Sequence, residues 1–189
     1  MNIDELFLKY RTCYEFSEQQ VDPQLLREIY DVSKYGSTSF NCSPLRVIFI
    51  HSEEQKKLLL DCVVPGNLEK TRSAPVTAIF AYDLEFYTHL PHLFPYMPVA
   101  GMFAKNQALS LETILRNSSL QAAYFMLVAR SKGLAYGAMS GFDTAKVEEY
   151  FLKDTKYKVN FLCNLGYQKI NSERKTLPRL SFEDACKFI

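Results

Sequence analysis

Two hydroxyl- and amide-bearing stretches have side chains that suit the edge of a flat, polar ligand. The first is the segment 37–44, which holds four hydroxyls and one amide and almost no charge. It lacks the Gly-rich cradle and the Lys that a phosphate-binding loop needs. It therefore predicts contact with an uncharged, planar ligand edge, although a Ser/Thr-capped turn between a helix and a strand is the commoner origin of such clusters. The candidate residues are Ser37, Thr38, Ser39 and Asn41.

The second stretch is Asn67 to Lys70, which precedes an apolar run. Residues three apart on one helical turn face the same way, so the amide and the ammonium are expected side by side. Together they predict a contact with a polar ligand edge. The alternative is a solvated turn.

A third candidate is the small-residue segment 137–143. Gly and Ala before Met139, and Ser140 and Gly141 after it, let a backbone approach a flat ligand closely. Asp143 then has the position of a helix N-cap.

Basic residues near both ends of the chain predict an anion site. Arg11 and Thr12 could grip an anion with a guanidinium fork and a hydroxyl. The alternative is an exposed Arg near a terminus. Lys175 and Arg179 lie in the C-terminal tail.

Metal chemistry is not expected. His89 and His92 are close in sequence, but no carboxylate or Cys pattern completes a ligand set. The five cysteines include no CxxC pair. We expect reduced, buried thiols rather than a disulfide framework or a zinc site.

Apolar patterning predicts the elements that must position these residues. Three β-branched and aromatic runs predict buried strands at 45–50, 75–82 and 159–167. Helical patterns lie at 1–16, 22–36, 52–62 and 102–132, the last expected in two pieces broken near Ser110. The aromatic, Pro-rich segment 83–100 reads as a lid or a packed excursion. Short strands separated by helices predict an α+β fold in one domain, 1–189.

Composition excludes several classes of protein. The 189 residues are 48% hydrophobic and 23% charged, with a formal net charge of +1. Such values are typical of an ordinary globular chain. Scattered basic residues argue against a nucleic-acid or anionic membrane partner, and no apolar run has the length of a membrane span. The N-terminus lacks the regions of a signal peptide, so a cytoplasmic protein is expected.

Taken in order, these motifs resemble the FMN-dependent nitroreductase family over nearly the whole chain. Each motif alone is weak, whereas the ordered set is specific. The segments 65–72, 81–87, 160–167 and 178–182 are most similar to the malonic semialdehyde reductase (3-hydroxypropanoate dehydrogenase) branch. That branch reduces a 3-oxo acid to 3-hydroxypropanoate.

The resemblance implies a central, mostly antiparallel sheet surrounded by helices, in an intertwined homodimer with FMN at the interface. NADH or NADPH is the implied reductant, passing hydride through flavin N5 to a small oxo acid in ping-pong fashion. It assigns the phosphate to Arg11, Thr12, Lys175 and Arg179, the pyrimidine edge to Asn67 and Lys70, and the surroundings of N5 to Met139, Ser140 and Gly141. Ser37, Thr38, Ser39 and Asn41 complete the cofactor set, the last three from the partner subunit.

The resemblance also implies catalytic roles for Lys70, Ser140 and Gly141. The Lys70 ammonium would stabilise charge that reduction places near N1 and C2=O. For the substrate carboxylate we expect Arg116 or Arg72, since a guanidinium binds carboxylates bidentately. An ion pair of Arg116 with Glu112 is the alternative. Phe103 is a further expected substrate contact.

One departure from the family pattern concerns charge. Many relatives carry basic residues where this chain has Tyr10 and Tyr14. The change removes positive charge near the phosphate and predicts weaker FMN binding, unless the hydroxyls substitute in part. Two alternative functions therefore stay open: a broad-specificity nitro or quinone reductase, and a flavin-binding protein without turnover.

Overall fold

The computed structural model describes residues 3–169 and 175–189. Its described strands form one sheet in the order β1-β2-β4-β3, with every neighbouring pair antiparallel. The predicted α+β fold with a mostly antiparallel sheet is confirmed. The strands are β1 (Leu45–Ile50), β2 (Val76–Asp83), β3 (Ala135–Met139) and β4 (Tyr157–Gly166).

The helices begin largely where the sequence places polar caps. Asp22, Ser52, Asp143 and Ser181 each accept a hydrogen bond from a backbone N–H in the first turn. The described helices are α1 (Ile3–Leu8), α2 (Pro23–Ser33), α3 (Glu53–Leu60), α4 (Leu68–Ser73), α5 (Leu90–Leu93), α6 (Ala100–Lys105), α7 (Gln107–Ser131), α8 (Thr144–Phe151) and α9 (Phe182–Ala185).

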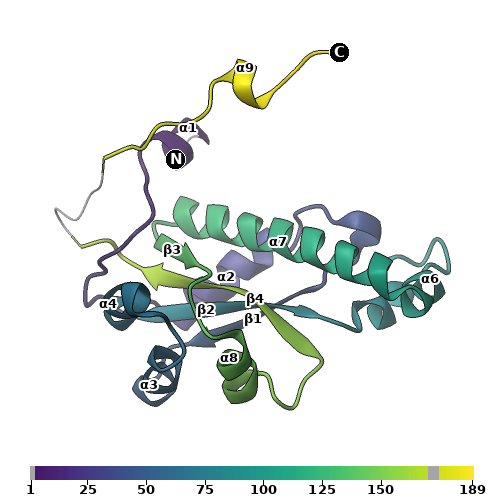
Figure 1. Cartoon of the computed structure of the whole chain (residues 1–189), viewed down its shortest axis with the longest axis horizontal. Coiled ribbons are helices and arrows are strands. Elements are labelled where there is room, and N and C mark those ends of the chain that lie inside the picture. The colour runs from purple at the N-terminus through teal and green to yellow at the C-terminus, as the bar shows by residue number, and fades with distance from the viewer. Residues whose placement is uncertain (1–2, 170–174) are drawn as a thin grey trace.

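Helices cover both faces of the sheet. In Figure 1, α7 runs along one side of it, and α3 and α8 lie on the other. The central strand β2 alternates between the two cores: Phe80 packs with Phe125 of α7, and Ile79 packs with the cluster that includes α3 and α8. Burial on both faces explains why β2 is nearly continuous in apolar residues rather than alternating with polar ones.

Three sequence expectations about this framework are wrong. The helical pattern at 1–16 gives a helix only over Ile3–Leu8, because Cys13 N donates to the Tyr136 carbonyl and Phe16 forms a bridge with Gln168. Residues 135–139 form the edge strand β3, which the patterning missed because Gly137 and Ala138 have little strand propensity. The long helical stretch breaks at Asn106 rather than near Ser110. Asn106 accepts from Leu109 N as the N-cap of α7, whereas the Ser110 hydroxyl donates to the carbonyl of Phe103 and sits within the helix.

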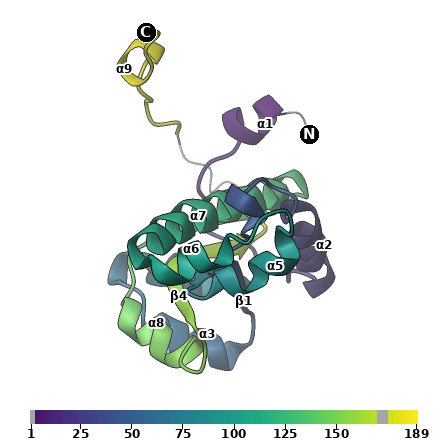
Figure 2. The ribbon, with the colours of Figure 1, turned by 90° about the vertical axis from the view of Figure 1, so that its right-hand side faces the viewer.

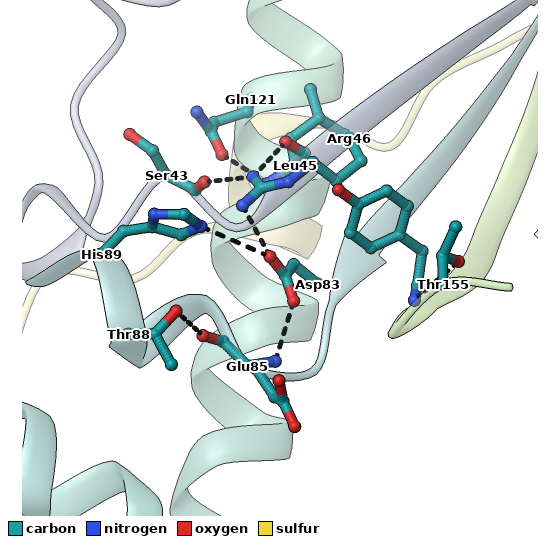
Figure 3. A network of polar contacts seen from close by, with 10 residues as sticks. Ser43, Leu45, Arg46, Asp83, Glu85, Thr88, His89, Gln121 and Thr155 are labelled. Carbon is teal, nitrogen blue, oxygen red and sulfur yellow. Dashed lines mark hydrogen bonds and ion pairs between the residues drawn. The ribbon is translucent and has the colours of Figure 1, made fainter.

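The segment after β2 is a packed excursion and not an open loop. It includes the 3₁₀ helix η3 (Phe86–His89) and α5. Phe86 and Leu90 are buried with Phe103 of α6. Asp83, at the end of β2, anchors its start: one carboxylate oxygen accepts from Arg46 at 2.7 Å and the other from Glu85 N at 2.9 Å (Figure 3).

The two ends of the chain lie outside these layers. Both views show α1 and α9 displaced to the same side of the sheet and helices (Figures 1 and 2). Arg11 and Thr176 hydrogen-bond, so the segments that follow α1 and precede α9 meet. Among the described helices, none combines the length and the apolar character needed to cross a membrane.

Candidate active site

The structure joins two of the predicted ligand-facing segments directly. Nδ2 of Asn67 donates to the carbonyl of Gly141 at 2.8 Å, across 74 positions of sequence. The backbone N–H of Val64 donates to the same carbonyl at 3.1 Å, and Val63 pairs with Phe142. The segments 62–67 and 141–143 therefore lie side by side, as a shared ligand requires.

Gly141 is required by this contact. A Cβ on it would lie 2.7 Å from Nδ2 of Asn67 and 2.8 Å from Val64 Cγ2. Both distances are shorter than a packed carbon tolerates. The absence of a side chain therefore lets the buried Asn67 amide reach the backbone, which is a reason for this glycine that the sequence alone did not show.

A buried polar network holds α4, which carries Lys70, against the sheet. The Thr77 hydroxyl donates to Oδ1 of Asn164 at 2.7 Å, and Nδ2 of Asn164 donates to the Thr71 hydroxyl at 3.2 Å. All three residues are essentially inaccessible to solvent. Because buried polar groups are costly unless paired, this network defines one position for α4.

The Lys70 ammonium lies 5.2 Å from the centre of the Tyr14 ring. Such a position over a ring face is attractive for a cation. Tyr14, one of the two departures from the family pattern, thus contacts the residue predicted to face the flavin edge. Met139 is buried at the end of β3, and Ser140 is exposed beside Gly141.

The four residues predicted to bind phosphate line one cleft. Arg11, Thr12, Lys175 and Arg179 surround a cavity of about 540 Å³ between the two ends of the chain. The Arg11 Nε donates to the Thr176 hydroxyl at 3.0 Å. Among the described residues, no Asp or Glu lines this space. We call it the cationic cleft.

Arg130, which sequence reasoning missed, also lines the cationic cleft. It is 5% exposed, and its Nε has no hydrogen-bond partner among the described residues. Burial raises the pKa of the adjacent Tyr136 phenol, and the Arg130 charge opposes that rise. A basic residue in the last turn of a helix ordinarily interacts with the helix dipole, so nothing in the sequence indicated that Arg130 lines a ligand site. An orphaned donor in a carboxylate-free cleft fits a phosphate group.

The segment 37–44 adopts an unusual backbone. Phe40, Asn41 and Ser43 have φ of 52°, 50° and 40°, in the left-handed region that non-glycine residues seldom enter. Tertiary contacts hold it: Ser39 N donates to Asn117, and Nδ2 of Asn41 donates to the Leu93 carbonyl at 3.0 Å. Local strain of this kind persists where the surroundings over-determine it, often at functional sites.

Further contacts at either end tie this segment to its neighbours. The Ser37 carbonyl accepts from the Tyr124 hydroxyl, and the Thr38 hydroxyl accepts from Ser43 N. Arg46 donates to the Ser43 carbonyl at 3.0 Å while also holding Asp83 (Figure 3). The whole segment is therefore fixed to α7, to α5 and to the end of β2.

Within one chain, this segment and the Asn67 region lie at opposite ends of β2. The helix α4 leads into the start of β2, and the segment 37–44 contacts the excursion that follows its end. Eight residues of strand span about 25 Å. In Figure 1, α4 and α6 accordingly mark the two ends of the long axis.

The two arginines predicted to bind substrate lie on different helices. Arg116, on α7, forms the anticipated ion pair with Glu112. Arg72, on α4, lies 3.4 Å from Glu69. Both arginines are exposed. Phe103 is 2% exposed and packs edge-on against Phe40 and Phe86, so its ring belongs to a core cluster in this structure.

Thiols in the fold are packed and protonated. Burial raises the pKa of Cys13, Cys42 and Cys62 to about 11 each, and that of Cys163 to about 12. All five cysteines are free; four are buried, whereas Cys186 is exposed, so the expectation of buried thiols is wrong for Cys186. Within residues 3–169 and 175–189, no three His, Cys, Asp or Glu side chains gather as a metal cluster would require.

Comparison with known proteins identifies relatives of the chain. The chain is 46% identical over 188 residues to a protein of Polynucleobacter asymbioticus provisionally named NADH dehydrogenase/NAD(P)H nitroreductase, covering 100% of this chain and 96% of that one. A protein of Ralstonia nicotianae with the same provisional name is 44% identical, covering 99% and 96%.

Solved structures share the fold. A provisionally assigned nitroreductase of Exiguobacterium sibiricum, crystallised in complex with FMN, superposes with a TM-score of 0.89 at 19% identity, covering 100% of this chain and 98% of that one. The nitroreductase family model matches residues 8–167. The chain therefore belongs to the nitroreductase family.

Proposed function

We propose that the protein is an FMN-dependent NAD(P)H oxidoreductase that reduces a small oxo acid such as malonic semialdehyde. The contact between Asn67 and Gly141 carries the proposal, because it unites two segments that the family resemblance assigns to the flavin ring. FMN supplies hydride transfer between the nicotinamide and the substrate. The names of the relatives point to NADH or NADPH as reductant, and the Exiguobacterium structure holds FMN.

The chain's own residues would bind and orient the cofactor. Arg11, Thr12, Lys175 and Arg179 would hold the phosphate in the cationic cleft. Nδ2 of Asn67 already donates to Gly141, so its Oδ1 is the atom that can accept from a ring N–H. Lys70 would place positive charge at the edge where reduction develops negative charge.

We propose further that the site is completed in a homodimer. Thr38, Ser39 and Asn41 lie about a strand length from the Asn67 region, so a second copy would have to bring them there. The sheet order leaves the outer edge of β1 unpaired among the described residues, beside a groove of about 1160 Å³ against α2. Exposed apolar residues of the tail offer material for such an interface: Leu177, Leu180, Phe182, Phe188 and Ile189.

The first experiment is an absorbance spectrum of the purified protein, followed by anaerobic titration with NADPH. We expect flavin absorbance that bleaches on reduction. Light scattering at micromolar concentration should give the mass of a dimer. A colourless protein that FMN cannot reconstitute would overturn the cofactor assignment, and a monomer that still binds FMN tightly would overturn the dimer.

The second experiment identifies the substrate handle. Arg116→Ala or Arg72→Ala, whichever arginine binds the carboxylate, should raise KM for malonic semialdehyde by roughly ten- to a hundred-fold. Reduction of an uncharged quinone by the same variant should barely change. Equal losses on both substrates, or none on either, would eliminate that arginine.

A second candidate function is a broad-specificity nitro or quinone reductase. The shared name of two relatives above 40% identity favours it. Turnover of a nitroaromatic compared with malonic semialdehyde, at equal enzyme and NADPH, separates the two. A kcat/KM that favours the oxo acid by tenfold or more supports the first function.

A further inference from the structure

Arg130 is a buried charge whose surroundings do not neutralise it. Its guanidinium lies 4.2 Å from the centre of the Tyr136 ring and 5.3 Å from that of Tyr10. Nη1 donates to the Leu6 carbonyl at 2.7 Å, and Nε has no partner among the described residues. Ring faces and one carbonyl hold the group in place, but they supply no counter-charge.

The neighbouring residues add further positive charge and do not neutralise Arg130. No carboxylate among the described residues forms an ion pair with Arg130, and the cationic cleft brings Arg11, Lys175 and Arg179 around the same space. Like charges in a partly buried cavity repel one another, and an unpaired buried charge is costly. An anion in the cleft would remove both costs at once. Phosphate suits it best, since several oxygens can accept from several guanidinium and ammonium donors.

The ring contacts connect this charge to the departure from the family pattern. By the family resemblance, Tyr10 replaces a basic residue, and its ring centre lies 5.3 Å from the Arg130 guanidinium. Arg130, in the last turn of α7, therefore brings a positive charge next to that position.

We propose that the Arg130 guanidinium, which lines the cationic cleft, binds the terminal phosphate monoester of FMN and so makes the site select FMN over riboflavin. The proposal rests on the proposed function insofar as FMN is the cofactor. It adds a phosphate-binding residue from α7 to the four from the chain ends.

The test compares FMN and riboflavin binding to the apoprotein by quenching of flavin fluorescence. Arg130→Met keeps the length and apolar body of the side chain and removes its charge. Loss of a charged hydrogen bond should weaken FMN binding about 10- to 100-fold. Riboflavin binding should stay within about twofold, because riboflavin has no phosphate. Inorganic phosphate should compete with FMN in the unmodified protein and much less in the variant.

Lys132→Met is the matched control. It removes a cation from the same end of the chain's long helix, where Lys132 pairs with Glu28 of α2 at 2.7 Å and not with the cleft. It should leave both affinities within about twofold. Arg130→Lys retains charge without the stacked guanidinium and should give an intermediate FMN affinity. Thermal unfolding of each variant checks the fold, and Arg130→Gln replaces Arg130→Met if the latter does not fold.

Three outcomes would overturn the proposal. Equal losses for FMN and riboflavin would make Arg130 a structural residue, and no loss for either would remove it from the site. A changed ratio of KM for NADPH to KM for NADH in the FMN-loaded variant, with FMN affinity intact, would assign the anion to the NADPH 2′-phosphate. If the unmodified protein binds FMN strongly but reduces no oxo acid, the proposed substrate fails and this proposal stands.

Discussion

The Asn67 region and the cationic cleft are built in opposite ways. The Asn164 network fixes α4, which carries Lys70, to the sheet. Backbone pairing with the segment 62–64 and the Asn67 amide fix Gly141. The cationic cleft is made largely by the two chain ends, which are joined by exposed hydrogen bonds from Arg11 to Thr176. Substitutions in the Asn67 region should therefore lower both FMN affinity and the free energy of unfolding. Substitutions of the chain-end residues in the cationic cleft should lower FMN affinity alone.

The largest effect is expected from Gly141→Ala. The new Cβ would displace either the Asn67 amide or Val64, and misplacement by about 1 Å at an active site can cost about 100-fold in activity. We expect a loss of that order in kcat/KM, measured with NADPH and a quinone. Gly66→Ala is the control, because nothing lies within 4 Å of its Cβ. Similar losses in both variants would contradict the special role of Gly141.

Asn164→Ala tests the support beneath α4. It leaves the Thr71 and Thr77 hydroxyls without their partner in a solvent-free site, so the free energy of unfolding should fall by about 2–3 kcal/mol. Urea denaturation measures the loss, and FMN affinity should fall with it. Asn160→Ala on the same strand removes bonds to the buried Ser118 and the exposed Ser119 of α7. It should cost about 1 kcal/mol, because the Ser118 hydroxyl keeps its bond to the Leu115 carbonyl and Ser119 reaches solvent. If Asn164→Ala unfolds no more easily than Asn160→Ala, the network does not hold α4.

Alkaline pH tests both regions through a buried thiol in each. The carbonyl of Cys62 accepts from Asp143 N next to Gly141, and Cys13 follows Thr12 of the cationic cleft. Burial raises the pKa of each thiol from 9.0 to about 11, so the unfolded chain releases these protons first. Stability is therefore full below pH 9 and is lost as the pH rises through 11. Urea denaturation at pH 8 and pH 10 should show the decline, and Cys13→Ala or Cys62→Ala should reduce it. A midpoint that does not change with pH would show that the thiols are not desolvated.

The smallest effect is expected from Thr176→Ala in the cationic cleft. Losing the two exposed hydrogen bonds from Arg11 Nε and Nη2 should change the free energy of unfolding by less than about 0.5 kcal/mol. FMN affinity should still fall about three- to tenfold, because Arg11 loses its orientation. The contrast with Asn164→Ala is the critical measurement: a stability loss as large as that of Asn164→Ala would erase the distinction between the two regions.

Much of the framework could be predicted, because its causes are local. The strands 45–50, 75–82 and 159–167 are runs with strong strand propensity, and Asp22 or Ser52 caps a helix through its own hydroxyl or carboxylate. β3 was not predicted because the reason for its Gly137 is a contact with a residue far away in the sequence. A Cβ on Gly137 would lie 2.5 Å from the Cys13 carbonyl oxygen.

The candidate site divides in the same way. The family resemblance assigned Asn67 and Gly141 to one ligand, and the structure brings these two residues into contact. It assigned Arg11, Thr12, Lys175 and Arg179 to a phosphate, and these residues line one cleft. Arg130 could not be found, because its significance lies in what is missing around it, and a missing partner is visible only in three dimensions.

The left-handed backbone at Phe40, Asn41 and Ser43 has a consequence for how this chain can change over evolutionary time. Contacts from Ser39 to α7, from Asn41 to α5 and from Pro44 to β2 hold this segment, so a single substitution in the segment 37–44 meets a backbone that cannot adapt to it. Changes in the range of ligands should therefore evolve by replacement of the whole segment 37–44 together with residues 84–105, which contain η3, α5 and α6. Libraries that recombine these two blocks between relatives should therefore retain more folded members than libraries that mutate the segment one residue at a time.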